Sequence, residues 1–490
     1  MMDGYVARKI QLCRPTTTRR SMAVTSTAQT PTAPGYRVLN PATGAILEEF
    51  ATATDTDIQE ALAAAENGYQ AWKNVDINER AKIVARVGEL FAERADELAA
   101  IATAEMGKPL SESKGEAEFC KDIFEYFATE GPSLAANQEI KAIGGGKAII
   151  ERLPVGPLLG IMPWNYPYYQ VARFAAPNLV LGNTIVLKHA ETCPRSALAI
   201  QKIMDDAGVP AGVYNNVFAS HEQISTIIAD DRIQGVSLTG SERAGAIIGE
   251  QAGRNLKKAV LELGGSDPYV ILDSADIAQD AATAWGTRME NTGQACNSNK
   301  RMIVMEDIFD DFVGELTKLA TGLVPGDPAV EAEGTFGPLS TRGAAEALAA
   351  QVQDAVDKGA TLHAGGVLHE GPGAYLAPTV LSGITKGMRA YYEELFGPVA
   401  VVYKVSSDEE ALELANDSQY GLGGAVFSTD PARAAKVASR LVTGMANVNT
   451  PAAEGADMPF GGVKRSGFGR ELGPLGMEEF VNKRLFYVAD

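Results

Sequence analysis

Short apolar runs alternate with longer amphipathic stretches along most of the chain, and this alternation constrains the fold more than any other feature. In the first half, the apolar runs are LLGIM (158–162), TIVL (184–187), GVSLT (235–239) and PYVIL (268–272). Helical patterns lie between them at 170–181, 195–207 and 244–252. Strands and helices in this order form βαβ units around a parallel sheet covered on both faces. The sequence therefore predicts an α/β fold whose ligand lies at the carboxyl ends of the strands.

The alternation returns in the second half of the chain and predicts a second α/β lobe. Its strand-like runs are RMIVM (301–305), TLHAGG (361–366), AVVYK (400–404) and GGAVFS (423–428), with helical patterns at 308–319, 342–358, 408–415 and 431–439. Amphipathic helices are also expected near the start, at 54–74 and 79–106. Two strands across a GGG turn at 139–153, and a last strand at 485–489, predict a small β arm through which subunits pair.

Composition narrows the classes of function. The chain has 490 residues and a net charge of −19, and no basic block interrupts its main body. This charge disfavours nucleic acid and anionic membranes as partners, because both are bound by clustered Lys and Arg. The cysteines (Cys13, Cys120, Cys193 and Cys296) form no CxxC motif, and the four histidines have no metal-ligand spacing. We therefore expect no metal site, no disulfide framework and a reducing compartment, the cytoplasm.

Residues 1–34 are expected to be a disordered leader. The first 21 residues hold five Arg or Lys and one Asp and contain no apolar core, so they are not a secretory signal. Two interpretations remain: an organellar transit peptide, or a start codon placed too early, with Met22 as the true start. The segment up to Pro34 continues as a polar tail rich in Pro and Thr.

One cysteine has unusual neighbours. Cys296 lies in NTGQACNSNK, a polar and flexible frame, whereas most free cysteines are small buried hydrophobes. A reactive thiolate needs such an accessible position; the alternative is a solvent-facing loop with an incidental cysteine. No histidine is close in sequence, so a carboxylate is the candidate base. Glu262 in LELGGSDP lies in an apolar run that would raise its pKa and suit it to general-base chemistry, although a capping or salt-bridged Glu would give the same pattern.

Three loops that follow predicted strands carry further candidates. Asn165 in GIMPWNYP could direct an amide N–H at an oxyanion, or could simply belong to a turn rich in Pro and Asn. Glu191 in VLKHAE follows a strand, where an acidic residue can bind the ribose hydroxyls of a dinucleotide. Gly240 and Ser241 in LTGSERAG open a helix, where a phosphate can bind, although no complete GxGxxG is present.

Taken together in their order, these motifs resemble those of the aldehyde dehydrogenase superfamily. The resemblance runs from about Tyr36 to the C-terminus through NPATG, MGKPL, PWNYP, VLKHAE, LTGS, LELGG, NTGQAC, EELFGPV, NDSQYGLGGAVFS and PFGGVKRSGFGRE. It implies a Rossmann-like NAD(P)-binding domain, a catalytic α/β domain and a small β oligomerisation arm. The implied boundaries are 35–130 and 149–261 for the NAD(P)-binding domain, 262–447 for the catalytic domain, 131–148 and 472–490 for the arm, and 448–471 for a substrate and anchor loop.

The resemblance also implies a mechanism. Cys296 would attack an aldehyde carbon to give a thiohemiacetal, and Asn165 with the Cys296 backbone N–H would hold the oxyanion. Hydride transfer to NAD(P) would leave a thioester, which water activated by Glu262 would hydrolyse to a carboxylic acid. Two alternatives from other classes are a thiol esterase that uses the same Cys–Glu pair without cofactor and a non-catalytic protein on this scaffold.

Cofactor contacts carry over from the same resemblance. The positions are Met162, Pro163, Trp164, Lys188, His189, Ala190, Glu191, Gly240, Ser241, Leu263, Glu394 and Phe396. Relatives that prefer NADP often have a small residue where Glu191 stands, and a carboxylate there would repel a 2′-phosphate. NAD is therefore the expected cofactor, with NADP possible because His189, in place of the commoner Pro, could approach a phosphate.

The expected substrate is succinate semialdehyde, because VLKHA and LELGGSDP look like the bacterial succinate-semialdehyde dehydrogenase group. Arg173 matches an arginine that binds the distal carboxylate in that group, and Tyr169 and Glu454 are expected to line the same pocket. Glu290, Glu454 and Asp457 add negative charge near that end. The alternative is a neutral aliphatic or aromatic aldehyde in a pocket lined by Trp164, Tyr168, Tyr169 and Trp285. A homodimer or homotetramer is expected.

Overall fold

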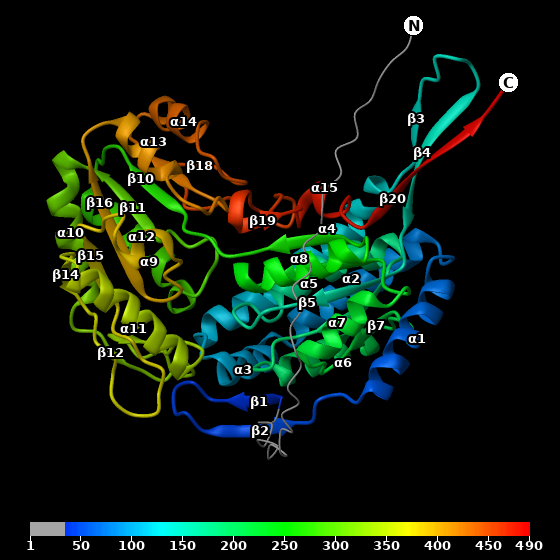
Figure 1. Cartoon of the computed structure of the whole chain (residues 1–490), viewed down its shortest axis with the longest axis horizontal. Coiled ribbons are helices and arrows are strands. Elements are labelled where there is room, and N and C mark those ends of the chain that lie inside the picture. Colours follow the sequence, from blue (N-terminus) through cyan, green and yellow to red (C-terminus); the bar gives the residue numbers. More distant parts are fainter. Residues whose placement is uncertain (1–34) are drawn as a thin grey trace, which may run out of the picture. The chain divides into compact units, whose positions relative to one another are not determined.

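The computed structural model describes residues 35–490, and the predicted leader with Cys13 lies outside them. Two sheets built mainly of parallel strands organise this part of the chain (Figure 1). The first sheet has the order β19-β9-β8-β5-β6-β7, and only β19 is antiparallel to its neighbour. Its strands are β5 (Pro157–Ile161), β6 (Thr184–Lys188), β7 (Tyr214–Asn216), β8 (Gly235–Thr239), β9 (Lys258–Glu262) and β19 (Gly467–Phe468).

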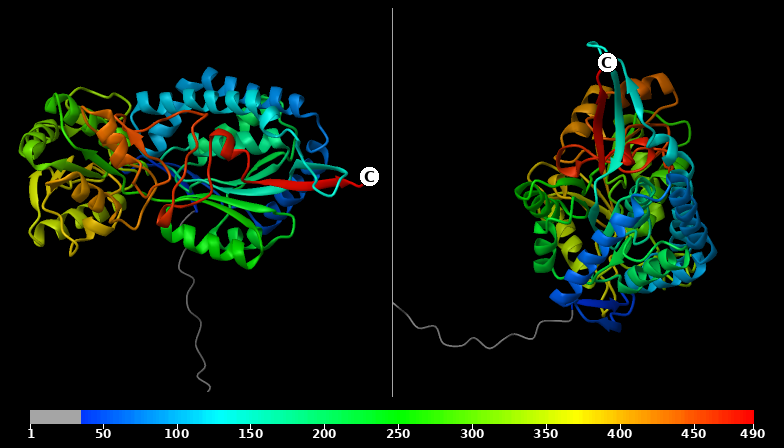
Figure 2. Two further views of the ribbon diagram at one scale, coloured as in Figure 1. Left: turned by 90° about the horizontal axis from the view of Figure 1, so that it is seen from above. Right: turned by 90° about the vertical axis from the view of Figure 1, so that its right-hand side faces the viewer.

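Successive side chains of one strand pack into hydrophobic clusters on opposite faces of this sheet. For this reason the central strands are continuous apolar runs in the sequence. In β6, Ile185 and Leu187 belong to one buried cluster and Val186 belongs to another. Side chains of a strand point alternately to the two faces of a sheet, so both faces are buried here. Figure 2 places helices on the two sides of these strands.

The helices of the two faces come from different parts of the chain. One face is covered by α5 (Tyr169–Leu181) and α6 (Pro194–Asp206), backed by α2 (Ile77–Glu93), α3 (Ala95–Met106) and α4 (Leu110–Leu134). The other face is covered by α1 (Asp55–Trp72), α7 (His221–Ala229) and α8 (Glu242–Arg254). The start of α1 is fixed by a capping box in which Thr54 accepts from the N–H of Asp57, so the predicted helix at 54–74 is confirmed.

The expected helical region 79–106 is two helices, α2 and α3, and the 25-residue α4 that follows them was not predicted. Its buried positions Ala117, Cys120, Phe124 and Phe127 recur at helical spacing, so the pattern was present in the sequence. A short hairpin before α1, β1 (Tyr36–Leu39) with β2 (Ile46–Phe50), was also missed.

The second sheet has the order β14-β15-β16-β11-β10-β17-β18, and β14 alone is antiparallel to its neighbour. Its strands are β10 (Pro268–Ile271), β11 (Arg301–Met305), β14 (Thr361–Ala364), β15 (Thr379–Ser382), β16 (Val399–Val405), β17 (Ala425–Phe427) and β18 (Asn447–Val448). The helices α9 (Ile277–Met289) and α10 (Glu306–Ala320) cover one face, and α11 (Arg342–Asp357), α13 (Asp408–Asn416) and α14 (Pro431–Ala438) cover the other. The predicted second α/β lobe is therefore confirmed.

A separate antiparallel sheet forms the predicted arm (Figure 1). It has the order β20-β4-β3, with β3 (Gln138–Ile140), β4 (Lys147–Pro154) and β20 (Val481–Val488). Most side chains of β3 and β20 are exposed, including Leu485, Phe486 and Tyr487. Among residues 35–490, no helix combines the length and the apolar composition that a membrane span needs.

Candidate active site

The predicted functional residues gather where parallel strands end. Loops follow β5, β6, β8 and β9 at one edge of the first sheet, because these four strands are parallel neighbours. Residues 263–267 then lead directly from β9 into β10 of the second sheet. Ligands of doubly wound folds bind at such an edge.

Cys296 follows a strained turn. Asn291, Thr292 and Gly293 have φ of 48°, 54° and 74°, three consecutive residues in the left-handed region. For residues other than glycine this conformation costs about 1–2 kcal/mol each and persists where the surroundings enforce it. A β-carbon on Gly293 would collide with the carbonyl of Gly397, so this position requires glycine for two reasons.

The sequence suggested that the polar frame around Cys296 is an exposed loop. The structure shows that most of it is buried. Only Cys296 and Asn297 of the ten residues 291–300 are partly exposed, and the others are buried. Their polar groups bond internally: Gln294 Nε2 donates to the Asn291 carbonyl (3.0 Å), and Asn299 Nδ2 donates to the Ala284 carbonyl (2.9 Å). The frame is thus a buried hydrogen-bonded support that leaves the thiol accessible.

Arg288 fastens this support to the second sheet. Its guanidinium is fully buried and donates to the carbonyls of Gly293 (3.1 Å), Leu395 (2.6 Å), Gly397 (2.6 Å) and Val399 (2.8 Å) and to Ser298 Oγ (2.9 Å). Burial lowers its pKa to about 9. Arg288 was not predicted, since it has no motif of its own in the sequence.

Burial raises the pKa of the Cys296 thiol to about 11, and the positive charges of Arg173 and Lys300 act in the opposite direction. Lys300 Nζ donates to the Ala295 and Cys296 carbonyls at 2.7 and 2.9 Å and lies 3.1 Å from Glu394 Oε1. Without ligand the thiol is therefore mostly protonated, and cationic groups are already positioned to favour its thiolate.

Glu262 ends β9 with an unusual environment. Its side chain is 2% exposed, and neither carboxylate oxygen has a hydrogen-bond partner among residues 35–490. Burial, with the charge of Glu471 acting in the same direction, raises its pKa well above the usual value, while Arg173 opposes the rise. Glu262 is also among the charges that raise the pKa of Cys296. Once ionised, a carboxylate in such an environment is a stronger base than an ordinary carboxylate.

Asn165 is buried beside the Cys296 support. Its Nδ2 donates to the Gln294 carbonyl (3.0 Å), and its own carbonyl accepts from Asn291 Nδ2 (2.8 Å). The amide nitrogen carries two hydrogens, so one remains for a ligand.

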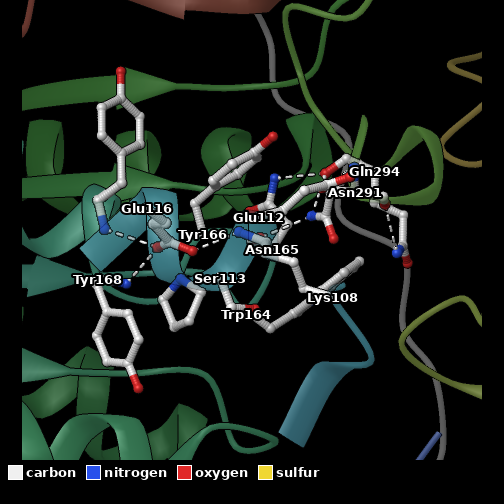
Figure 3. A network of polar contacts seen from close by, with 12 residues as sticks. Lys108, Glu112, Ser113, Glu116, Trp164, Asn165, Tyr166, Tyr168, Asn291 and Gln294 are labelled. Atoms are coloured by element: carbon white, nitrogen blue, oxygen red, sulfur yellow. Dashed lines mark hydrogen bonds and ion pairs between the residues drawn. The ribbon is translucent and has the colours of Figure 1, made fainter. Parts of the chain in front are cut away.

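Two carboxylates of α4 hold these loops in place (Figure 3). Glu116 accepts from the backbone N–H groups of Tyr168 (2.8 Å) and Tyr169 (2.9 Å) and pairs with the buried Lys108 (2.5 Å). Glu112 accepts from the N–H of Asn291 (2.6 Å). Glu112 and Glu116 were not predicted, because α4 was not recognised in the sequence. Lys108 was noted only as part of the MGKPL motif, without a role.

The acidic residue after β6 has a cationic partner. Lys188 and Glu191 form an ion pair (2.5 Å), and His221 Nε2 lies 3.3 Å from the same carboxylate, whose side chain is 39% exposed. Burial raises the pKa of Glu191, but Lys188 more than offsets this effect and the net shift is downward. Glu191 is thus charged and partly accessible at the sheet edge.

His189 differs from expectation. Its ring is fully buried, Nε2 lies 2.9 Å from the Pro167 carbonyl, and Nδ1 accepts from the N–H of Ala190 (2.8 Å). Burial lowers its pKa to about 4, so the ring is neutral at pH 7. The suggestion that this side chain approaches a phosphate was wrong, because both ring nitrogens are already engaged.

The remaining predicted cofactor positions lie around the same edge. Ser241 is the N-cap of α8 and accepts from the N–H of Ala244 (3.3 Å), and the Leu263 side chain packs against Gly245. Met162, Pro163 and Ala190 follow β5 and β6, and Gly240 donates to the Glu262 carbonyl (3.0 Å).

The second lobe contributes the loop of Glu394 and Phe396. Glu394 Oε1 accepts from the N–H of Gly265 (3.0 Å), and the Phe396 ring lies 5.8 Å from that of Trp164 at 89°. Both contacts bridge the edge of the first sheet and the second sheet.

Arg173 is not where the substrate prediction placed it. It is fully buried, it forms an ion pair with the buried Glu471, and its Nη2 lies 3.2 Å from Thr239 Oγ1. A cavity of about 590 Å³ opens beside Cys296, and Arg173 does not line it. The prediction of direct contact with a substrate carboxylate was therefore wrong in this structure, since Glu471 takes that position.

Aromatic side chains form part of the cavity lining. Tyr169 and Glu454 line the cavity as expected, together with Phe119, Tyr166 and Phe460. Trp164, Tyr168 and Trp285 do not, and the Tyr168 hydroxyl instead donates to the Leu98 carbonyl (2.8 Å). Within residues 35–490, no cluster of three or more His, Cys, Asp or Glu side chains could hold a metal ion.

Comparisons with known proteins agree with this geometry. The model of the aldehyde dehydrogenase family matches residues 28–485. The chain is 52% identical over 450 residues to a succinate-semialdehyde dehydrogenase (NADP⁺) of Deinococcus radiodurans, covering 92% of this chain and 94% of that protein. It is 41% identical to the succinate semialdehyde dehydrogenase (NAD(P)⁺) Sad of Escherichia coli K12, over 91% of this chain and 96% of that one. The crystal structure of succinic semialdehyde dehydrogenase from Streptococcus pyogenes with NADP⁺ superimposes with a TM-score of 0.90 at 42% identity, covering 93% of this chain and all of that one.

The turn before Cys296 provides a stability test. Gly293→Ala should lower the free energy of unfolding by about 1–3 kcal/mol, because alanine resists the left-handed conformation and its β-carbon meets Gly397. Gly286→Ala is the control, since it lies inside α9 with open space around it and should be neutral or slightly stabilising. Urea denaturation of both variants measures the difference; equal midpoints would contradict the strain assigned to Gly293.

Proposed function

Because the chain belongs to the aldehyde dehydrogenase family, we propose that it oxidises succinate semialdehyde to succinate with a nicotinamide dinucleotide, through a thioester on Cys296. The observation that carries the proposal is that Cys296 lines the cavity, that the charge of Glu262 acts on its thiol, and that Asn165 is bonded to the Gln294 carbonyl, two residues before Cys296. The relatives named for succinate semialdehyde support the choice of substrate.

The first step is addition of Cys296 to the aldehyde. The thiol first loses its proton to water; the thiolate Sγ then bonds to the carbonyl carbon, the π electrons move to oxygen, and a thiohemiacetal alkoxide forms. The second hydrogen of Asn165 Nδ2 and the backbone N–H of Cys296 donate to this oxygen, and Arg173 and Lys300 favour the thiolate electrostatically. Arg173 therefore acts by its charge and not by contact.

A bound nicotinamide dinucleotide supplies the oxidation by accepting the hydride of the substrate carbon. The described residues fit such a group. Glu191 offers an exposed acceptor for ribose hydroxyls, and the first turn of α8 offers backbone N–H groups to a phosphate. Glu394 and Phe396 face the same edge from the second lobe.

Hydrolysis of the thioester completes the cycle. Glu262 accepts a proton from water, the water oxygen attacks the thioester carbon, and the C–S bond breaks to return the Cys296 thiolate and release the acid. The unpartnered Glu262 carboxylate suits this task, since no hydrogen bond within the protein has to be broken first.

The far carboxylate of succinate semialdehyde meets no cation in the cavity lining. Two features make the cavity compatible with this carboxylate. The Arg173 guanidinium lies behind the wall, 5.1 Å from the Tyr169 ring and 4.6 Å from the Phe460 ring. Burial and the charge of Glu290 raise the pKa of Glu112 to about 7, although the hydrogen bond from the Asn291 N–H acts in the opposite direction. The protonated form of Glu112 can therefore donate a hydrogen bond to the substrate carboxylate.

The β arm is proposed to join subunits into a homodimer or homotetramer. Both outer strands, β3 and β20, have a free edge among the described residues and expose apolar side chains. Such edges commonly pair with another chain.

Cys296 and Glu262 can be separated kinetically. Glu262→Gln should slow turnover of succinate semialdehyde by about 10²–10⁴-fold and leave a burst of about one NADH per subunit, because the thioester forms and is not hydrolysed. Cys296→Ser should lose both burst and turnover. Stopped-flow absorbance of NADH distinguishes them; turnover of Cys296→Ser at the wild-type rate, or ester hydrolysis without any NADH, would refute the mechanism.

The pH profile tests the role of Glu112. Its pKa is raised, so the carboxyl is neutral below about pH 7 and charged above it, where it repels an anionic substrate. The ratio of kcat/KM for succinate semialdehyde to that for hexanal should fall about tenfold from pH 6 to pH 8. The neutral aldehyde corrects for ionisation of Cys296 and Glu262. In Glu112→Gln the ratio should be flat; a slope unchanged in that variant would contradict the assignment.

Cofactor choice tests Glu191. We propose that NAD is preferred, because a 2′-phosphate would have to displace the Glu191 carboxylate from Lys188. Glu191→Ser should raise the kcat/KM ratio of NADP to NAD by about tenfold or more, since Lys188 becomes free to bind the phosphate. Glu222→Ser, which removes an exposed charge from the first turn of α7, is the control and should leave the ratio unchanged. A wild-type preference for NADP would overturn the proposal.

A further inference from the structure

A buried ammonium lies against the peptide units on both sides of Cys296. Lys300, the residue directly before β11, is 1% exposed. Its Nζ donates to the Ala295 carbonyl at 2.7 Å and to the Cys296 carbonyl at 2.9 Å, and it lies 3.1 Å from Glu394 Oε1. An ammonium carries three N–H bonds, so these three acceptors use all of them. The charge is therefore held in one place, beside the backbone of the nucleophile.

The Ala295 carbonyl belongs to the same peptide unit as the backbone N–H of Cys296. A peptide unit is planar and conjugated, so a positive charge at its oxygen draws electron density from its nitrogen and strengthens the N–H as a donor. Among residues 35–490, no backbone carbonyl accepts from the N–H of Cys296, which stays available to a bound carbonyl. Lys300 thus acts on the N–H that the proposed mechanism assigns to the oxyanion.

The Cys296 carbonyl has little room to turn. It lies against Gly265, where a β-carbon would come within 2.5 Å of its oxygen. No backbone N–H of the described residues 35–490 donates to this carbonyl, and the Lys300 ammonium does. One side chain therefore fixes the orientation of both peptide units that flank the Cα of Cys296.

The second oxyanion donor is supported separately. Asn165 Nδ2 donates to the Gln294 carbonyl (3.0 Å), which belongs to the preceding peptide unit and is not one of the three acceptors of Lys300. A change of Lys300 should therefore alter the backbone donor and leave the Asn165 amide in place.

A counter-ion role toward Glu394 accounts for only part of this geometry. Glu394 is 18% exposed and also accepts from the N–H of Gly265 (3.0 Å). The ion pair uses one of the three N–H bonds of Lys300, and the two bonds to carbonyls are the shorter ones. Hydrogen bonds from a charged donor are roughly twice as strong as neutral ones. Most of the donor capacity of Lys300 is thus spent on the backbone around Cys296.

We propose that Lys300 is a positioning residue for the backbone half of the oxyanion hole: it holds the Ala295–Cys296 peptide unit in place and polarises the Cys296 N–H. This rests on the proposed chemistry at Cys296 and adds to it, since the effect on the substrate oxygen is separate from the effect of the same charge on the thiolate. Lys300 transfers no proton. Thiolate Sγ bonds to the carbonyl carbon, the π electron pair moves to oxygen, and the polarised N–H donates to that oxygen.

The test places a carbonyl at the oxyanion position without using the dinucleotide. In Glu262→Gln, Cys296 is acylated by p-nitrophenyl hexanoate with a ¹³C-labelled carbonyl: thiolate Sγ bonds to the carbonyl carbon, p-nitrophenolate leaves, and the thioester carbonyl remains beside the Cys296 N–H. Isotope-edited infrared spectroscopy measures its C=O stretch, whose frequency falls as hydrogen bonding to the oxygen strengthens. Adding Lys300→Met, a neutral side chain of similar length, should shift this stretch to higher frequency.

Lys300→Gln provides a second variant and decides the matter if Lys300→Met does not fold. The amide keeps an N–H donor and loses the charge, so the stretch should again lie above that of the Glu262→Gln parent.

A ratio of rates separates the oxyanion from the thiolate. The burst of p-nitrophenolate depends on both, whereas the reaction of Cys296 with 2,2′-dipyridyl disulfide depends on the thiolate alone, because this reagent has no carbonyl. The phase that is absent from Cys296→Ser belongs to Cys296. The ratio of burst rate to disulfide rate should fall about tenfold in Lys300→Met, less than the loss of about 10²–10³-fold on removal of a whole oxyanion donor.

Two further proteins serve as controls. Lys318→Met removes an exposed lysine of α10 and should leave both the stretch and the ratio unchanged. Lys300→Met/Glu394→Gln removes both charges of the ion pair, so a pure counter-ion role predicts a return to the parent values. We expect the shifted stretch and the lowered ratio to persist in this double variant, because the Ala295 carbonyl still lacks its cationic donor.

The role of Lys300 and the proposed function fail in different ways. A stretch and a ratio unchanged in Lys300→Met and Lys300→Gln, or restored in the double variant, would overturn the role of Lys300 and leave the proposed function intact. Absence of NADH formation with every aldehyde, while the ester still acylates Cys296, would remove the proposed function, and the infrared shift would still report on Lys300.

Discussion

The buried guanidinium of Arg288 is the interaction on which the site depends. No carboxylate within the described residues 35–490 pairs with it. It is satisfied by four backbone carbonyls and a serine hydroxyl, drawn from the Cys296 support, the Glu394 loop and β16. A buried charge requires this degree of hydrogen bonding, because an unsatisfied one costs several kcal/mol. One side chain therefore fixes the distance between the Cys296 support and the Glu394 loop, and the strained turn at Asn291 to Gly293 is held by the same bonds.

A second fixed point is the contact between Lys108, just before α4, and Glu116 of that helix. The two side chains are buried as a pair, and Lys108 also lies 3.5 Å from the centre of the Tyr166 ring. Through Glu116 and Glu112 this helix orients the loop after β5 and the turn before Cys296, so Asn165 is positioned from two sides. Glu112 and Glu116, which position these loops, also contribute negative charge to the cavity lining. A change of either glutamate should therefore alter both the geometry of the site and the charge of the cavity.

Sequence patterns were sufficient to predict those features that depend only on residues close together in the chain. The strand runs predicted both sheets, because side chains buried on both faces leave a continuous apolar signal. Cys296 was singled out by its polar frame, Glu262 by its place in an apolar run, and Asn165 by its loop after a predicted strand. Partners distant in sequence were not predictable: nothing local indicates that Arg173 meets Glu471 or that Arg288 binds the carbonyls of 395–399. His189 was misjudged for the same reason, since its ring is committed to the Pro167 carbonyl. The assigned roles and the domain boundaries stay predictions.

The C-terminal segment completes the first lobe, and this has a consequence for biosynthesis. β19 pairs with β9 at Glu262, Glu471 neutralises Arg173, and β20 pairs with β4. Residues 467–488 are thus required by strands that are synthesised before them. Until these residues have left the ribosome, the β9 edge is unpaired and Arg173 lacks the carboxylate that compensates its burial, a loss of about 3–5 kcal/mol. Cys296 and Glu262 therefore reach the geometry described above only after this later segment has emerged.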